Sequence, residues 1–321
     1  MNHSSTHSIA QLNIFGAILI FSSPRLPAAD EAIALYFLAD MRTLEEALSS
    51  PIEKLPLATE PWIGKGHVAG YDISSHAILL EDGVRPADVR PPLSGKPFVF
   101  VAGGERLYVG AVWTPLSSLL PPSGVPVINT PAFGVPPSIC LIELPRIIRH
   151  GKKERADPRE DPRLRKSLEA TGLLRKGIAL SLEKVEVSKE RDSLTYTYSI
   201  RNQEDSPLHV LDPEKVSPQL FQYFTGGVTL LADGWKSIVA TPREEPRAPQ
   251  EFDAAWMFVL KKGESIRRTV ILDGFNTMVP GSYEVSFTFR TPSFRGSEPA
   301  KPREGRIWQG KRETRLRIEV R

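Results

Sequence analysis

The feature of this sequence that most constrains its fold is an alternation of apolar and polar residues that recurs from residue 178 to residue 321. It is clearest between residues 281 and 290, where apolar side chains occupy every second position. These side chains are Tyr283, Val285, Phe287 and Phe289. A period of two places them on one face of an extended chain, which is the pattern of a half-buried β-strand.

Seven segments of strand length follow one another in this region. They are residues 178–187, 192–202, 227–231, 256–260, 265–272, 282–290 and 314–320. Turns rich in Gly, Pro, Asn and Asp separate them, and such a series is typical of an immunoglobulin-like β-sandwich. The Cys-Trp-Cys core of antibody domains is absent, because the only cysteine is Cys140, but many sandwiches lack that core. We therefore expect residues 178–321 to form an immunoglobulin-like β-sandwich.

Residues 30–145 mix strand and helix patterns. An apolar run at residues 32–39 has the length of a strand, and the residues after it recur at helical spacing. The apolar positions of this helical stripe are Met41, Leu44, Ala47 and Leu48. Two further strand-like runs, 97–102 and 105–113, flank Gly103-Gly104, which suits the type I′ turn of a β-hairpin. We expect a small α+β or β-rich domain here.

Residues 146–177 are dense in Lys and Arg, with Asp and Glu interleaved. Such mixed charge is typical of a solvated face rather than of a polyanion-binding site. Asp161 followed by Pro162 predicts the start of a helix, and Gly172 suits its C-terminal cap. The expected fold class is thus mainly β with a small α+β part, in two domains joined by a charged, proline-containing connector with a short helix.

The N-terminus carries a candidate export signal. Residues 14–21 form an apolar run, which Ser22-Ser23-Pro24 interrupts, and small residues follow at Ala28 and Ala29. The run is too short to cross a bilayer, which takes about 20 residues. No Lys or Arg precedes it, so an ordinary buried strand or an extension is the alternative. We expect residues 1–29 to be a signal peptide, and the processed protein to be extracytoplasmic, periplasmic or secreted, without a stable transmembrane span.

Composition narrows the classes of partner. The chain has 41 Lys and Arg against 38 Asp and Glu, a net charge of +3, which gives no overall field of the kind that nucleic-acid binders have. No nucleic-acid partner is expected. A single cysteine excludes an intrachain disulfide and argues against a cysteine-based metal site. No motif indicates a bound cofactor, and we expect none.

Two turns of the C-terminal region support a family resemblance. One is Lys262-Gly263-Glu264, between two strand-like segments, and the other is Pro280-Gly281-Ser282-Tyr283 at the start of the next segment. These turns resemble those of immunoglobulin-like domains in secreted bacterial proteins. The stretch 94–118 is similar to a segment of uncharacterised exported bacterial proteins. The resemblance implies an immunoglobulin-like architecture and an extracytoplasmic location, and it implies no activity.

Residues that could carry chemistry are few. Ser74, Ser75 and His76 are adjacent, as in a nucleophilic site, but no G-x-S-x-G turn surrounds either serine, and a turn leading into a strand accounts for all three. His67 and His76 could share a metal ion, although no further ligand completes a shell. No catalytic or metal-binding residue is therefore predicted.

A candidate recognition surface lies after the predicted hairpin. Tyr108 and Trp113, followed by Ser117 and Ser118, come at the mouth of a proline-rich loop, where aromatic side chains often bind partners. A loop-anchoring role for Trp113 is the alternative, and the same choice applies to Trp308 and Trp235.

The sequence does not determine the function. We expect a non-catalytic binding or structural protein of the bacterial cell envelope, with an envelope protein or a glycan as its partner. Two alternatives remain open: an extracytoplasmic hydrolase with its site in the N-terminal domain, and a proteinase inhibitor.

Overall fold

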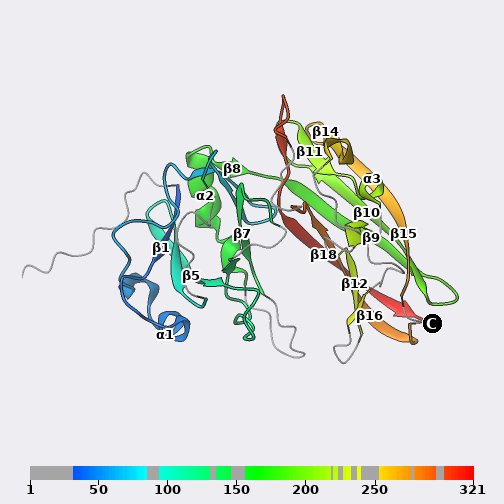
Figure 1. Ribbon diagram of the computed structural model, residues 1–321, viewed down its shortest axis with the longest axis horizontal. Coiled ribbons are helices and arrows are strands. Elements are labelled where there is room, and N and C mark those ends of the chain that lie inside the picture. Colours follow the sequence, from blue (N-terminus) through cyan, green and yellow to red (C-terminus); the bar gives the residue numbers. More distant parts are fainter. Residues whose placement is uncertain are drawn as a thin grey trace, which may run out of the picture.

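The protein is mainly β, as the sequence predicts. The computed structural model describes residues 32–84, 94–130, 135–145, 156–217, 220–222, 227–232, 237–239, 253–275, 278–293 and 300–321. The expected signal peptide, Trp235 and residues 146–155 lie outside these ranges. Figure 1 shows two groups of sheets side by side, an N-terminal group coloured blue to green and a C-terminal group coloured green to red. No described helix is long and apolar enough to cross a bilayer.

The N-terminal group is one sheet in the order β1-β4-β5-β6-β7-β3-β2-β8. Its strands are β1 (Ile33–Phe37), β2 (Val68–Asp72), β3 (Ala77–Leu80), β4 (Pro97–Ala102), β5 (Glu105–Trp113), β6 (Val127–Asn129), β7 (Ile139–Glu143) and β8 (Leu174–Arg175). The helices beside it are α1 (Leu44–Ser49), η1 (Ile52–Lys54), η2 (Pro158–Glu160) and α2 (Pro162–Ala170).

The β4–β5 hairpin confirms the prediction made from its turn. Ala102 pairs with Glu105, and the two glycines between them adopt φ angles of 55° and 80°. A type I′ turn needs positive φ at both positions, which glycine adopts without steric cost.

Helix α2 begins where the sequence predicts it to begin. The Asp161 carboxylate accepts a hydrogen bond from the Arg163 amide at 2.9 Å, and Gly172 follows the helix with φ 70°. The helix is more than part of a connector, however. Leu164 and Leu168 are fully buried in the core of the N-terminal sheet, and β8 pairs with β2. Leucines four residues apart share one helical face, and the sheet covers that face.

The C-terminal group contains three sheets. One has the order β15-β10-β9, the second β14-β11-β17 and the third β13-β12-β16-β18. The strands are β9 (Ile178–Val187), β10 (Ser193–Asn202), β11 (Leu208–Leu211), β12 (Val228–Ala232), β13 (Ser237–Val239), β14 (Met257–Leu260), β15 (Ser265–Asp273), β16 (Gly281–Arg290), β17 (Arg306–Ile307) and β18 (Lys311–Val320). The short helices α3 (Pro213–Val216) and η3 (Ala254–Trp256) lie among them, and residues 220–222 are also helical.

The apolar faces of these sheets meet in one core. The ring of Tyr198 in β10 lies 4.8 Å, centroid to centroid, from that of Phe287 in β16. Phe289 and Trp308 extend the contact and are fully buried. The alternation along β16 thus has the predicted effect, because its apolar residues are buried and its polar residues are not.

Candidate functional site

An open, mostly apolar groove of about 1210 Å³ lies where the chain leaves β1 and enters α1. Residues 37–45 and Leu48 form one wall, and residues 94–97 with Trp113 and Pro122 form the other. The walls therefore come from the segment between β1 and α1, from the entry into β4, and from the end of β5 with the loop after it. Loops at the end of a rigid sheet are a common position for binding sites.

Capping of α1 decides which side chains face this groove. Thr43 Oγ1 accepts from the Glu46 amide at 3.3 Å, and the Glu46 carboxylate accepts from the Thr43 amide at 2.8 Å. This capping box starts the helix at Leu44, three residues later than the expected stripe. Leu44 turns inward, whereas Met41 stays outside the helix and is fully exposed, and Leu48 is 45% exposed.

Charges in the groove balance one another. Arg42 pairs with Asp40 at 2.7 Å, and the Lys96 ammonium lies 4.4 Å from the centroid of the Phe37 ring. Phe37 in turn stacks on Trp62 at 4.9 Å. The cations are thus held by a carboxylate and by an aromatic face, so apolar shape rather than charge dominates the groove.

Trp113 anchors the loop that borders the groove. Its indole N–H donates to the carbonyl of Leu119 at 3.2 Å, and the Thr114 amide donates to Ser94 Oγ at 3.3 Å. The indole is half-buried, so one part of the ring holds the loop while another lines the groove. The anchoring and the recognition roles considered for this residue are therefore compatible.

The structure separates the residues grouped as a recognition surface. Trp113 lines the groove, and Ser117 and Ser118 lie in the adjoining loop. Tyr108 lies on the opposite face of β5, 5% exposed, with its ring stacked on Phe100 at 4.9 Å. Because the two aromatic residues are five positions apart, strand alternation sends them to opposite faces, and Tyr108 takes no part in this surface.

The other groove wall, residues 37–48, was not recognised as part of a site. The sequence placed Met41 and Leu48 on the same helical stripe as Leu44 and Ala47, and only the structure shows that these two side chains are exposed rather than in the core.

The adjacent Ser74, Ser75 and His76 form the turn between β2 and β3. The Asp72 carboxylate organises this turn, since its Oδ1 accepts from the Ser74 amide at 2.9 Å and from Ser74 Oγ at 2.6 Å. His76 adopts φ 54°, and its ring nitrogens lie 3.3 Å from the Tyr71 hydroxyl and 3.3 Å from a Glu160 carboxylate oxygen.

This arrangement does not activate a serine. Within the described residues His76 contacts neither hydroxyl, and Ser75 Oγ is buried without a hydrogen-bond partner. A serine nucleophile needs a base within hydrogen-bond reach. Burial also lowers the pKa of His76, despite its hydrogen bond with Glu160, so the ring is neutral at pH 7.

The same turn joins the two groups of sheets. Ser74 Oγ accepts from the Trp308 indole N–H and from the Ile178 amide, both at 3.2 Å. Arg306 donates to Asp72 at 2.5 Å and also pairs with Glu204. The buried polar cluster is therefore a structural junction.

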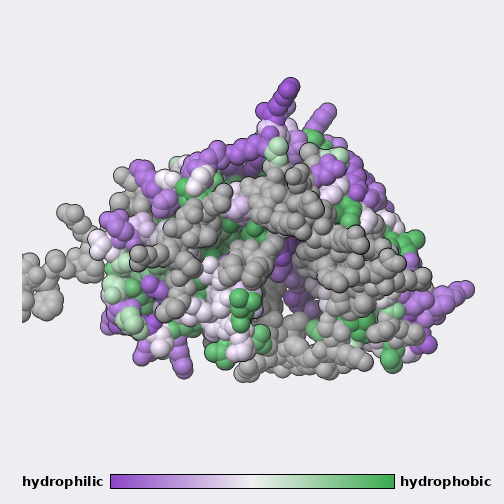
Figure 2. Space-filling model, in the orientation of Figure 1, coloured by the Kyte–Doolittle hydropathy of each residue, from purple (hydrophilic) through white to green (hydrophobic). Residues whose placement is uncertain are grey.

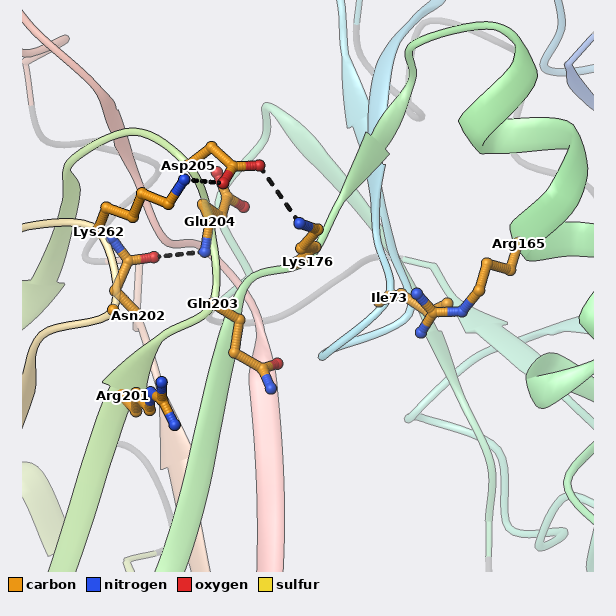
Figure 3. Close-up of a pocket in the computed structure, with 10 residues that line it drawn as sticks. Ile73, Arg165, Lys176, Arg201, Asn202, Gln203, Glu204, Asp205 and Lys262 are labelled. Atoms are coloured by element: carbon orange, nitrogen blue, oxygen red, sulfur yellow. Dashed lines mark hydrogen bonds and ion pairs between the residues drawn. The ribbon is translucent and has the colours of Figure 1, made fainter.

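A smaller polar cleft of about 400 Å³ lies near this junction (Figure 3). Asp205 pairs there with Lys176 at 3.3 Å and with Lys262 at 2.7 Å, while Arg165 extends from α2 on the other side. All four side chains are about half or more exposed to solvent. Solvated ion pairs of this kind hold a ligand weakly, and we assign this cleft no function.

Metal ligation finds no support in the described part of the chain, where no three His, Cys, Asp or Glu side chains cluster. The Nδ1 of His67 is engaged in a local hydrogen bond, which it accepts from the Gly64 amide at 3.4 Å. Burial raises the pKa of Cys140 to about 12, so its thiol is protonated and unreactive at neutral pH.

Comparisons with known proteins assign no family. No protein-family model matches the chain, and no curated protein matches it. Among solved structures, a beta-glucosidase from Kluyveromyces marxianus in complex with glucose is similar at 16% identity with a TM-score of 0.19. The match covers 44% of this chain and 14% of that enzyme. So limited a likeness indicates neither fold nor activity.

Proposed function

We propose that this protein is a non-catalytic binding protein of the bacterial cell envelope, and that the groove beside Trp113 is its recognition site. The observation that carries the proposal is the fully exposed Met41 in an apolar groove of about 1210 Å³. Apolar surface of this extent is costly in water unless a partner covers it, and contiguous exposed apolar patches mark interaction sites.

The chemistry of the groove favours an apolar protein segment over a glycan. Its large apolar side chains are Phe37, Met41, Leu48 and Trp113, and two of its charged groups, Arg42 and Asp40, are paired with each other at 2.7 Å. The volume exceeds the ~300–1,000 Å³ of common small-molecule pockets and suits several residues of a peptide. We propose an envelope protein as the partner.

The proposal also covers the domain architecture and the cellular location of the protein. The seven strands expected between residues 178 and 321 are present, and their facing apolar surfaces support an immunoglobulin-like domain. That domain would present the N-terminal domain and its groove at the cell envelope. Residues 1–29, as a signal peptide, would direct the chain there.

A crosslinking experiment tests the groove. A photoreactive amino acid at position 41 should capture an envelope protein, whose purified form should bind the wild-type protein saturably. Met41→Asp should weaken that binding at least tenfold, because it places a charge in an apolar contact. Val279→Asp is the matched control, since Val279 is 70% exposed in the C-terminal group, and its binding should equal that of the wild type.

Other outcomes would reject this function. Equal binding by the Met41→Asp and wild-type proteins would place the interface elsewhere. Turnover of ester, peptide or glycoside substrates by the purified protein would favour the hydrolase alternative. Inhibition of a serine, cysteine or metalloprotease would favour the inhibitor alternative.

A further inference from the structure

The stretch from Leu107 to Ile142 contains no Asp, Glu, Lys, Arg or His, although charged residues make up 25% of the chain. Buried strands account for part of this absence of charge, because β5, β6 and β7 lie in the interior of the N-terminal sheet. They do not account for the loop after Trp113, which lies at the surface. A surface loop without charge is unusual, because charged side chains are what normally cover a protein surface.

The loop from residue 114 to residue 122, here named the leucine loop, exposes its apolar side chains. Leu116, Leu119 and Leu120 are 76%, 71% and 78% exposed. They belong neither to a described core cluster nor to the lining of the groove. Figure 2 shows separate hydrophobic side chains, in green, among hydrophilic and neutral ones near the lower edge of the N-terminal group.

Several backbone groups of the leucine loop are hydrogen-bonded within the loop or to Trp113 at its base. The Leu116 and Leu119 amides donate to Thr114 Oγ1 at 3.3 Å and to Ser117 Oγ at 3.1 Å, and the Leu119 carbonyl accepts from Trp113. The Ser117 amide donates to the Thr114 carbonyl at 3.0 Å. Exposed leucines whose own amides are bonded locally, as at Leu116 and Leu119, suit a medium that offers few hydrogen bonds.

We propose that the leucine loop inserts into the boundary between headgroups and acyl chains of a phospholipid bilayer, and so holds the protein reversibly at a membrane surface. Trp113 lies at the base of the loop, where its amphipathic ring would meet the headgroups. A protein partner is the weaker candidate for this loop, because protein interfaces combine an apolar centre with a polar rim, and the loop carries no charged side chain. Three leucines give weak attachment and no span.

Flotation of the full-length protein with phosphatidylcholine vesicles tests the proposal. The wild-type protein should float with the vesicles, equally at low and at high NaCl, because salt screens electrostatic attraction and the insertion of an uncharged loop does not depend on it. The triple variant Leu116→Ser, Leu119→Ser, Leu120→Ser should partition at least tenfold less. The matched control is Val259→Ser, Ile271→Ser, Val279→Ser, which removes three exposed apolar side chains of the C-terminal group and should float like the wild type.

Circular dichroism and the midpoint of thermal unfolding will show that both triple variants are folded. Equal flotation of the loop variant and the wild type would overturn the proposal, as would flotation that requires anionic lipid and low salt. Failure of the wild type to float would also overturn it. The inference is independent of the groove's partner, because the loop variant should keep its affinity for a purified groove partner in lipid-free solution. A loss of that affinity without vesicle binding would assign the loop to the protein interface.

Discussion

Arg306 and Asp72 form a buried ion pair although 234 positions separate them in the chain. The Arg306 Nη2 donates to Asp72 Oδ2 at 2.5 Å, and the Asp72 side chain is completely buried. Glu204 also accepts from the Arg306 guanidinium, with its Oε2 3.1 Å from the Nε. The pair ties the end of β2, where the turn to β3 begins, to β17, so the turn that the sequence argues against as a nucleophilic site is where the two groups of sheets meet.

Neutralising Asp72 should destabilise the protein strongly. Asp72→Asn keeps the Oδ1 acceptor of the turn and removes the charge that faces Arg306. Loss of one partner from a buried pair typically costs about 3–5 kcal/mol, and we expect the lower end because Glu204 remains. Urea unfolding measures the free energy of unfolding. Asp205→Asn, which neutralises a carboxylate 68% exposed, should change it by less than about 1 kcal/mol. If Asp72→Asn lowered the free energy of unfolding by less than about 1 kcal/mol, as expected for Asp205→Asn, the result would contradict the role of the pair.

Local structure was largely predictable from the sequence, because its causes are local. Gly103-Gly104 specified the β4–β5 hairpin, and Asp161 followed by Pro162 specified the start of α2. The alternation of Tyr283 to Phe289 specified β16 and its buried face. β11 was missed because it is only four residues long and lies between Pro207 and Pro213, which resembles a loop, although all four residues pair with β14 and two of them with β17.

The candidate sites depended on long-range contacts, and the sequence indicated them less well. Nothing near Ser74 indicates that Trp308 will donate to its hydroxyl. Trp113 could be singled out because it ends a strand and precedes a proline-rich loop. Its partner wall around Met41 could not, because the position of that wall depends on how β1, β4 and β5 align.

Gly310 should not tolerate a side chain. A Cβ atom at this position would lie 2.5 Å from the Cβ of Ser75, closer than real contacts allow. We expect Gly310→Ala to lower the free energy of unfolding by about 1–3 kcal/mol through overpacking of the junction. Combining it with Ser75→Gly should restore most of the loss, because Ser75 Oγ has no hydrogen-bond partner among the described residues. Equal losses in the single and double variants would show that the clash is not the cause.

Cys140 should resist alkylation in the native protein. The residue is 2% exposed in β7, and burial raises its pKa to about 12, so almost no thiolate exists at pH 8. Iodoacetamide labelling, followed by mass spectrometry, should be at least a thousandfold slower in buffer than in denaturing urea. Labelling within tenfold of the denatured rate would mean that the N-terminal sheet opens readily.

His76 should make the protein less stable as the pH falls below about 6.5. Burial lowers its pKa in the folded state, and the hydrogen bond with Glu160 opposes this only in part. Between the folded value and the ordinary value of about 6.5, the unfolded chain binds a proton that the folded chain does not. The contribution of His76 to the free energy of unfolding is therefore complete above pH ~6.5. It is lost as the pH falls from there toward the folded-state pKa, by at most ~1.4 kcal/mol per pH unit for one proton.

The variant His76→Asn isolates this effect. Asparagine tolerates the positive φ of this position, so the turn can keep its shape without the titrating ring. The free energy of unfolding, measured in urea at pH 7.5 and at pH 5.5, should fall less between the two values in the variant than in the wild type. Carboxylates such as Glu160, whose pKa the hydrogen bond with His76 lowers, titrate below this window and do not obscure the comparison. The same pH dependence in both proteins would show that His76 binds its proton equally well in the folded and the unfolded states.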